Sequence, residues 1–430
     1  MNTRLAAALA AITLATTILP VSAETEQRTK KTDEKPRRFV FLTNPDSEKN
    51  NNEILNIFKE TESPYFQDPQ APRFILLDRK NRVAFGIGGY IKTTISYDFA
   101  GIADDVDFIT YDIPVPRGTD KSQFQMDAST SRIFFKLVGN NPVMKKFTAY
   151  IETDFRGGNY ALHLRQAYLS FRGLKIGQAW STFTDLTSIP PTIDFQGPNA
   201  STELLNVQLQ YSITIKDKWQ IAAAMENPGG TMTYGADARA AKQICPDFIT
   251  YAQYSWNADS HIRFTQLYRG IRYYNNVSGH NRSIFGWGLQ LSGAAALNKK
   301  WTLYYQATGG QGIERYINDL SGNNLDAVAT TTPGKLKAPY TTACVVGVQY
   351  NITPALFIST SYSYTHLYKC SNMATADDLY KHGQYLVGNV FWTIADNWQV
   401  GAEYLFGQRK NQNNQKAIAN RMQIMAQYNF

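Results

Sequence analysis

From Arg82 to Phe430 the chain is a succession of segments, each about ten residues long, in which apolar and polar side chains alternate. In NVQLQYSITI, which begins at Asn206, every second residue is apolar and the residues between are Asn, Gln, Ser or Thr. Successive side chains of a β-strand point to opposite faces, so this period of two predicts strands with one apolar and one polar face. The pattern predicts an all-β fold for residues 82–430.

The connections between these segments alternate in length. Seven are short turns, and eight other connections, most of them longer, lie between them, which implies about sixteen strands with both ends on the short-turn side. An even number of antiparallel strands with this alternation is typical of a transmembrane antiparallel β-barrel of a bacterial outer membrane. The short turns are predicted at residues 140–143, 172–173, 215–218, 257–260, 298–300, 351–354 and 395–397.

Tryptophan placement favours a membrane barrel over a soluble β-sandwich. Five of the seven Trp residues lie beside a short turn, hence at one rim of the predicted barrel. Amphipathic rings are enriched at membrane–water interfaces, whereas a soluble sandwich would scatter them through its core. The five are Trp219, Trp256, Trp301, Trp392 and Trp398.

The N-terminus has the features of an export signal. One early arginine is followed by an apolar run and then by the small residues VSA, which end at Ala23. We expect residues 1–23 to be a signal peptide cleaved near Ala23. Residues 24–81 are predicted to be a periplasmic N-terminal linker with one short helix in NNNEILNIFKE, and residues 82–430 to form the barrel.

The last segment, RMQIMAQYNF, predicts how the barrel closes. A closed barrel requires the last strand to pair with the first, near RVAFGIGGYIKTTISYD, because an open sheet edge is not tolerated in lipid. Tyr428 and Phe430 fall on the apolar face of this strand. A terminal aromatic of this kind resembles the signal read by the outer-membrane barrel assembly machinery, so we expect these two residues to act as an assembly signal.

The sequence carries no enzyme or metal motif. The five His residues form no H-E-x-x-H pattern, no G-x-S-x-G occurs, and the three Cys residues form no C-x-x-C pair. The formal charge of +8 is dispersed singly along the strands, so no nucleic-acid surface is indicated. We expect no catalytic activity, no cofactor and no metal, and pairing between Cys245 and Cys370 stays open.

Eight basic residues fall on the polar faces of their strands. A charge on the lipid face costs roughly 2 to 4 kcal/mol at the bilayer midplane, so alternation places these residues in the lumen, where they can attract anions. Alternatively, each is a solvated wall residue or pairs with Glu152, Asp154, Glu203 or Glu403. The eight are Arg132, Lys136, Arg156, Arg165, Arg263, Arg269, Arg409 and Arg421.

The third long connection, at about residues 183–203, contains three prolines and a glycine and is therefore shaped by its sequence. Porins fold their third loop back into the lumen. With Asp185 and Asp194 the connection presents carboxylates opposite the basic residues, and we expect it to be a constriction loop. The alternative is an ordinary surface loop.

Four motifs resemble the DcaP-type (DcaP-like) trimeric porins of Gram-negative outer membranes: FGIGGYIKTTISYDF, STSRIFFKLVG, LRQAYLSFRGLKIGQAWSTFTDL and IDFQGPNAS. The resemblance implies a sixteen-stranded homotrimer that passes small anionic solutes, dicarboxylates in the member that gave the family its name. The N-terminal segment is too short for the long coiled coil of some members. The matching motif positions are Arg132, Arg165, Asp194 and Phe195.

The leading functional prediction is an outer-membrane porin for passive diffusion of small, anionic solutes through an arginine-lined lumen, embedded in outer-membrane lipid. A structural or adhesive barrel with a blocked lumen, using the long connection at 311–339 for binding, is the alternative. A soluble secreted β-protein, such as a glycan-binding domain, is a third. Single-channel conductance separates the first two, and heat-modifiable gel migration separates a barrel from a soluble protein.

Removal of Phe430 is expected to lower the yield of assembled barrel more than it lowers the conductance of the molecules that do assemble. The reason is that the terminal aromatic lies on the apolar face at the end of the closing strand. Heat-modifiable gel migration measures the yield, and planar-bilayer recording measures the conductance. A normal yield from a chain ending at Asn429 would refute the assembly-signal interpretation.

Overall fold

The computed structural model of the chain describes residues 39–41, 56–58, 60–61, 63, 65–70, 72, 74–78, 83–101, 106–116, 122–374 and 378–430. The predicted signal peptide and the first part of the predicted linker lie outside these residues. Within them, no helix is both long enough and apolar enough to span a bilayer.

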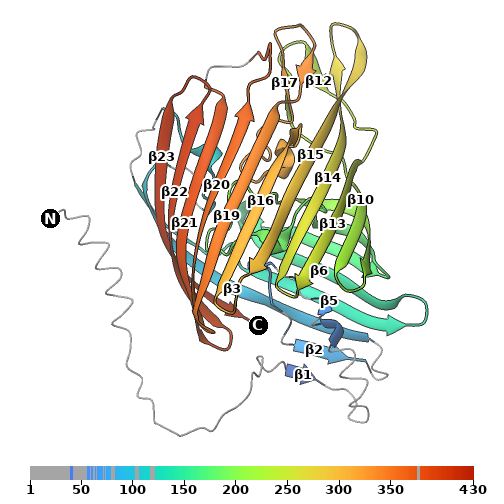
Figure 1. Cartoon of the computed structure of the whole chain (residues 1–430), viewed down its shortest axis with the longest axis vertical. Coiled ribbons are helices and arrows are strands. Elements are labelled where there is room, and N and C mark those ends of the chain that lie inside the picture. The colour runs from blue at the N-terminus through green and yellow to red at the C-terminus, as the bar shows by residue number, and fades with distance from the viewer. Residues whose placement is uncertain are drawn as a thin grey trace, which may run out of the picture. The chain divides into compact units, whose positions relative to one another are not determined.

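Within the described residues, sixteen antiparallel strands close into one barrel, which confirms the predicted fold class (Figure 1). The first strand is β3 (Val83–Ala100), and the second is broken into β4 (Gln123–Asp127) and β5 (Arg132–Asn141), which both pair with β3. The others are β6 (Lys145–Gly157), β7 (Ala161–Phe171), β8 (Leu174–Trp180), β9 (Leu205–Ile215), β10 (Trp219–Glu226), β13 (Asp247–Asn257), β14 (Ser260–Asn275), β15 (His280–Ala296), β16 (Trp301–Gln311), β19 (Tyr340–Thr353), β20 (Leu356–Tyr368), β21 (Tyr380–Ala395), β22 (Trp398–Asn411) and β23 (Lys416–Asn429).

The last strand closes the barrel on the first, as predicted. β23 pairs antiparallel with β3 from Asn429 opposite Tyr90 to Asn420 opposite Ala100. Phe430 continues this ladder by exchanging two backbone hydrogen bonds with Gly89, at 3.1 and 3.0 Å. The two edges of the sheet thereby satisfy each other's backbone donors and acceptors.

The predicted turn pattern and aromatic rim are both observed. All seven short turns join consecutive strands. The connection predicted near 272–282 is shorter than expected, because β14 and β15 stay in register up to Asn275 and His280. All five rim tryptophans are between 42% and 48% exposed. Three of them pack, with tilted rings, against the tyrosine directly opposite on the neighbouring strand, with ring centroids 4.5 to 5.0 Å apart: Trp219 against Tyr254, Trp301 against Tyr350, and Trp398 against Tyr428.

The apolar core lies inside the barrel, where long loops fold onto the inner wall. The largest cluster joins Phe183 from the third loop, Ile313 and Tyr316 from the loop after β16, and wall residues such as Ile249 and Leu267. A second cluster packs Phe108 and Ile113, from the loop after β3, onto β21, β22 and β23. The long loops contain the short strands β11 (Met232–Thr233), β12 (Ala238–Ala240), β17 (Ala327–Ala329) and β18 (Leu336–Lys337). The 3-10 turns of the described residues are η1 (Thr110–Asp112), η2 (Gly158–Tyr160), η3 (Leu186–Ser188) and η4 (Glu314–Tyr316).

Two short strands before the barrel, β1 and β2, lie at its short-turn end (Figure 1). β1 (Phe39–Phe41) pairs parallel with β2 (Phe74–Leu77), and β2 pairs antiparallel with β3 between Ala84 and Ile87. Because β5 occupies the other edge of β3 there, β2 continues the edge that β23 leaves at Phe430. Residues 56–58 and 60 are helical.

A separate apolar cluster anchors this N-terminal segment. Ile57 and Phe58 are buried against Ile75 and Leu77 of β2 and against the barrel residues Ala84 and Val138. We call the described residues 63, 65–70 and 72, which lie between the helical residues and β2, the inner strap. The three cysteines, at 245, 344 and 370, are free, so Cys245 and Cys370 do not pair in this structure.

Phe58→Ala is expected to detach the N-terminal segment while the barrel stays folded. Phe58 is fully buried, and removing a buried phenyl ring costs about 3 to 5 kcal/mol. Limited proteolysis of the membrane-inserted protein should therefore cleave before β3 much faster than in wild type. Phe124→Ala is the matched control, since Phe124 is 63% exposed. Equal protease resistance of the two variants would contradict the anchoring role.

Candidate functional site in the barrel lumen

The third loop, between β8 and β9, lies inside the barrel and follows its inner wall. Near its start, Asp185 is within 2.8 Å of His261 Nε2 on β14 and accepts a hydrogen bond from Ser292 on β15, at 2.6 Å. Ser188 accepts a hydrogen bond from Gln306 on β16, at 2.8 Å. Turns with proline and glycine give the loop a fixed shape that can make such contacts in succession.

Farther along, a carboxylate of the opposite wall holds the loop backbone. Glu403 on β22 accepts the backbone N–H groups of Ile193 and Asp194, at 2.7 and 2.8 Å. Asp194 is itself buried and accepts a hydrogen bond from the Tyr385 hydroxyl, at 3.1 Å. Burial, with the nearby Glu403 and Asp107 carboxylates adding to it, raises the pKa of Asp194. The loop thus reaches from β14 to β22 along the inside of the barrel.

Two of the predicted arginines come together in one charged network. Arg132 Nη1 lies 2.9 Å from Asp68 Oδ1 and 3.2 Å from Glu152 Oε1. Arg165 lies 3.0 Å from the same Glu152 oxygen and 3.1 Å from Asp154 Oδ2. All five side chains are at least nine-tenths buried. Pairing with Glu152 and Asp154 was the alternative left open by the sequence, and the structure shows it for both arginines.

Phe195 of the third loop lies among three guanidinium groups. The ζ-carbons of Arg132, Arg156 and Arg165 lie 5.4, 4.6 and 5.1 Å from its ring centroid. Cation–π attraction of this kind is stronger when the cation is desolvated. Arg156 also pairs with Asp107, at 2.7 Å, and keeps a quarter of its side chain exposed.

The other predicted basic residues are divided among separate contacts. Arg269 pairs with Asp247 and Asp326, and Arg421 pairs with Asp98. Arg409 donates to the Tyr111 carbonyl and to Asn411, and Lys136 donates to the Thr61 carbonyl. Arg263 donates to Gln253 and to the Thr184 carbonyl, and its distance to Asp185 is 3.7 Å. The eight residues are therefore spread over the inner wall rather than gathered in one ladder.

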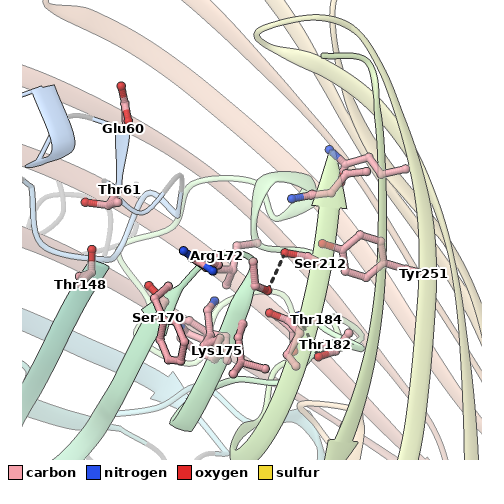
Figure 2. A pocket seen from close by; sticks show the side chains of 18 of the residues that line it. Glu60, Thr61, Thr148, Ser170, Arg172, Lys175, Thr182, Thr184, Ser212 and Tyr251 are labelled. Carbon is pink, nitrogen blue, oxygen red and sulfur yellow. Dashed lines mark hydrogen bonds between the residues drawn. The ribbon is translucent and has the colours of Figure 1, made fainter. Parts of the chain in front are cut away.

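A cavity of about 600 Å³ lies between the third loop, the N-terminal segment and the wall from β6 to β14 (Figure 2). Figure 2 shows Arg172 and Lys175 at this cavity, with Glu60 and Thr61 from the N-terminal segment and Tyr251 from the wall. A second cavity, of about 260 Å³, is lined by Asp68, Lys136, Lys175 and Trp180 among others. Concave, partly polar spaces of this kind are where small molecules are held or passed.

Lys175 belongs to both cavities and was missed by the sequence analysis. Its ammonium nitrogen lies 5.3 Å from the Tyr168 ring centroid, and within the described residues it forms no hydrogen bond or ion pair. The signal was present in LKIGQAW, where Lys175 alternates with the apolar residues Leu174 and Ile176.

The inner strap supplies lumen residues that the linker interpretation did not anticipate. The Tyr65 hydroxyl donates to Glu203, at 2.9 Å, and Gln67 donates to Thr192 Oγ1 and to the Asp194 carbonyl, at 3.0 and 2.8 Å. Burial raises the pKa of Glu203 to about 7. The aromatic and proline-rich stretch SPYFQDPQAP, unlike the charged residues before it, was the available signal.

Comparison with known proteins agrees with this architecture. The profile of the DcaP outer membrane protein family matches residues 77–430. The crystal structure of the outer membrane channel DcaP of Acinetobacter baumannii superimposes with a TM-score of 0.72 at 19% identity, covering 82% of this chain and 99% of that one. No curated protein sequence matches the chain significantly.

Two further solved structures share only the fold. A loop L8 deletion mutant of OmpT of Vibrio cholerae gives a TM-score of 0.51 at 13% identity, over 81% of this chain and 100% of that one. OmpF of Salmonella typhi, in complex with daunomycin, gives 0.50 at 10% identity, over 82% and 99%. The resemblance to DcaP-type porins is confirmed by the profile match, which covers most of the chain. The chain belongs to the DcaP outer membrane protein family.

Proposed function

We propose that this outer-membrane channel is a porin selective for small anionic solutes, which diffuse passively past the third loop. The observation that carries the proposal is the excess of cations around the larger cavity. Among the described residues, the charged ones that line it are the basic Lys146, Arg172, Lys175 and Arg263 and the acidic Glu60 and Asp185.

Most of the charged side chains that line the larger cavity have a partner of opposite charge in the described part of the chain, and those without one are positively charged. Lys146 and Glu60 form an exposed ion pair, at 2.7 Å. The Asp185 carboxylate lies 2.8 Å from His261 Nε2 and 3.7 Å from Arg263 Nη2. Within the described residues, Arg172 and Lys175 have no acidic partner. Two unit charges about 4 Å apart interact by about 1 kcal/mol in water and by about 4 kcal/mol at an effective dielectric near 20, so a narrow lumen strengthens their attraction for anions.

In this proposal Arg132 and Arg165 have a structural role and do not attract the solute. Because Arg132 and Arg165 share Glu152 and bind further carboxylates, their charges are largely compensated. We assign them to positioning Phe195 and the third loop, with Asp185 and Asp194 as attachment points of the same loop. The constriction that this loop provides is part of the proposal.

The assembly proposed for this channel is a homotrimer in the outer membrane of a Gram-negative bacterium, reached after signal-peptide cleavage near Ala23. The support is the export-type N-terminus and the resemblance of the four motifs to trimeric porins. The barrel assembly machinery is proposed to read Tyr428 and Phe430.

A barrel with a blocked lumen is the second candidate function. It is favoured by the amount of chain inside the barrel: the loops after β3, β8 and β16 and the inner strap all pack onto the inner wall. Such a barrel would serve a structural or adhesive purpose through its outer loops. Absence of single-channel conductance in a planar bilayer would favour this candidate over the porin.

Lys175→Gln is expected to lower the preference of the channel for anions. Removing one unit charge at roughly 5 to 8 Å from a hydrated ion changes the anion-to-cation permeability ratio by about two- to fourfold. The reversal potential across a bilayer in a salt gradient measures this ratio. The control is Lys299→Gln, which removes an exposed charge from a short turn outside the cavity. Equal shifts in both variants, or a wild-type preference for cations, would refute anion selection by this cavity.

A further inference from the structure

The inner strap crosses the inside of the barrel and contacts opposite walls. Phe66 packs edge-on against Phe357 of β20 and Phe391 of β21, with centroid distances of 5.8 and 4.9 Å. Tyr65 and Gln67 bond to the third loop. Asp68 accepts a hydrogen bond from Trp180 of β8, which lies halfway around the barrel from β20, and also meets Arg132 at the start of β5. A connection that only tethered the barrel would not need these contacts.

The Asp68 carboxylate occupies a site built from three donors. Arg132 Nη1 lies 2.9 Å from Oδ1, while the Ser63 hydroxyl and the Trp180 indole N–H donate to Oδ2, at 2.6 and 3.3 Å. The side chain is only 2% exposed. Burial, followed by the nearby Glu152 carboxylate, raises the pKa of Asp68, and the Arg132 guanidinium works in the opposite direction. A guanidinium with two neutral donors is a typical setting for a carboxylate, and here the carboxylate belongs to the chain itself.

The Asp68 carboxylate is surrounded by positively charged side chains, whose charge it partly compensates. Asp68 lines the smaller cavity together with Lys136 and Lys175, so the described residues bring two ammonium groups and one carboxylate to this space. The Arg132 guanidinium is buried, and its Nε and Nη2 atoms have no hydrogen-bond partner within the described residues. Without the Asp68 charge, Arg132 would keep only its share of Glu152, and the cavity would become more positive.

We propose that Asp68 determines the specificity of the channel: on the inner strap it acts as a tethered anion that occupies the Arg132 site and limits both anion preference and conductance. This inference rests on the channel function proposed above and extends it to a segment outside the barrel strands. A solute carboxylate that passes this region meets a site already filled by the chain. The strap anchors at Tyr65 and Phe66 keep that internal carboxylate in place.

The first test compares Asp68→Asn with wild type by reversal potential in a salt gradient, at about pH 8, because a high pH favours the ionised form of a carboxylate whose pKa is raised. The anion-to-cation permeability ratio should rise by about two- to fourfold, the effect expected for one unit charge near the ion path. Asp68→Glu, which keeps the charge, should stay close to wild type. Asp259→Asn is the control, because it removes a carboxylate from a short turn between β13 and β14, away from the Arg132 site.

The second test removes the strap anchors with the double variant Tyr65→Ala, Phe66→Ala. Its conductance in symmetric salt should rise, because the strap no longer crosses the lumen. Heat-modifiable gel migration confirms that the barrel is folded. If Asp68→Asn fails to fold, this variant decides the proposal by itself.

Two results would overturn the inference: a folded Asp68→Asn channel with the wild-type permeability ratio, or a folded anchor variant with wild-type conductance. Failure of this inference can be told apart from failure of the proposed function, because each test compares the permeability ratio or conductance of a variant with that of wild type. If wild type does not conduct, the porin proposal fails. In that case, conductance that appears in the anchor variant supports the strap as a block, and continued absence overturns it.

Discussion

The structure depends on the backbone hydrogen bonds between β3 and β23. The hydrocarbon region of a membrane offers no water to an unpaired N–H or C=O group, so a sheet survives there only when its two edges satisfy each other. The ladder from Tyr90 to Ala100, extended by Phe430 on Gly89, meets that requirement. Once the sheet is closed, every strand has an inside and an outside, and the period of two decides which side chains enter the lumen.

Closure of the barrel also places the charged side chains of the polar faces in a confined interior. Inward charges cannot reach the bulk solvent freely, and a buried charge is tolerated only when it is paired and hydrogen-bonded. Arg132 and Arg165 share Glu152, and Arg269 lies between Asp247 and Asp326. These pairings hold strands, loops and strap together, whereas Arg172 and Lys175 keep their charge at the cavity. The number of basic residues in a lumen is therefore a poor measure of its field, because pairing decides which of them act on a solute.

The loops and the N-terminal segment determine how the lumen of this barrel is filled. The same sixteen-stranded wall could surround an open pore, but here the third loop is held from β14 to β22 and the inner strap crosses from β20 to β5. These elements are attached by side chains to the wall, and each attachment is a point at which conductance and selectivity can be tuned without changing the barrel. Function within such a fold thus resides in the segments added to the wall.

The sequence by itself determined the strand number, the seven short turns, the closure and the tryptophan rim, because each depends on the period of two and on turn residues close together in the chain. It also determined that residues such as Arg132 and Arg165 face inward. Only the tertiary structure decided their partners. Asp68 and Arg132 are 64 positions apart, and Glu403 and the Ile193 amide are 210 apart. Parity fixes the face of a side chain, but the partner depends on where a loop or a terminal segment folds, and that is settled by packing between distant parts of the chain.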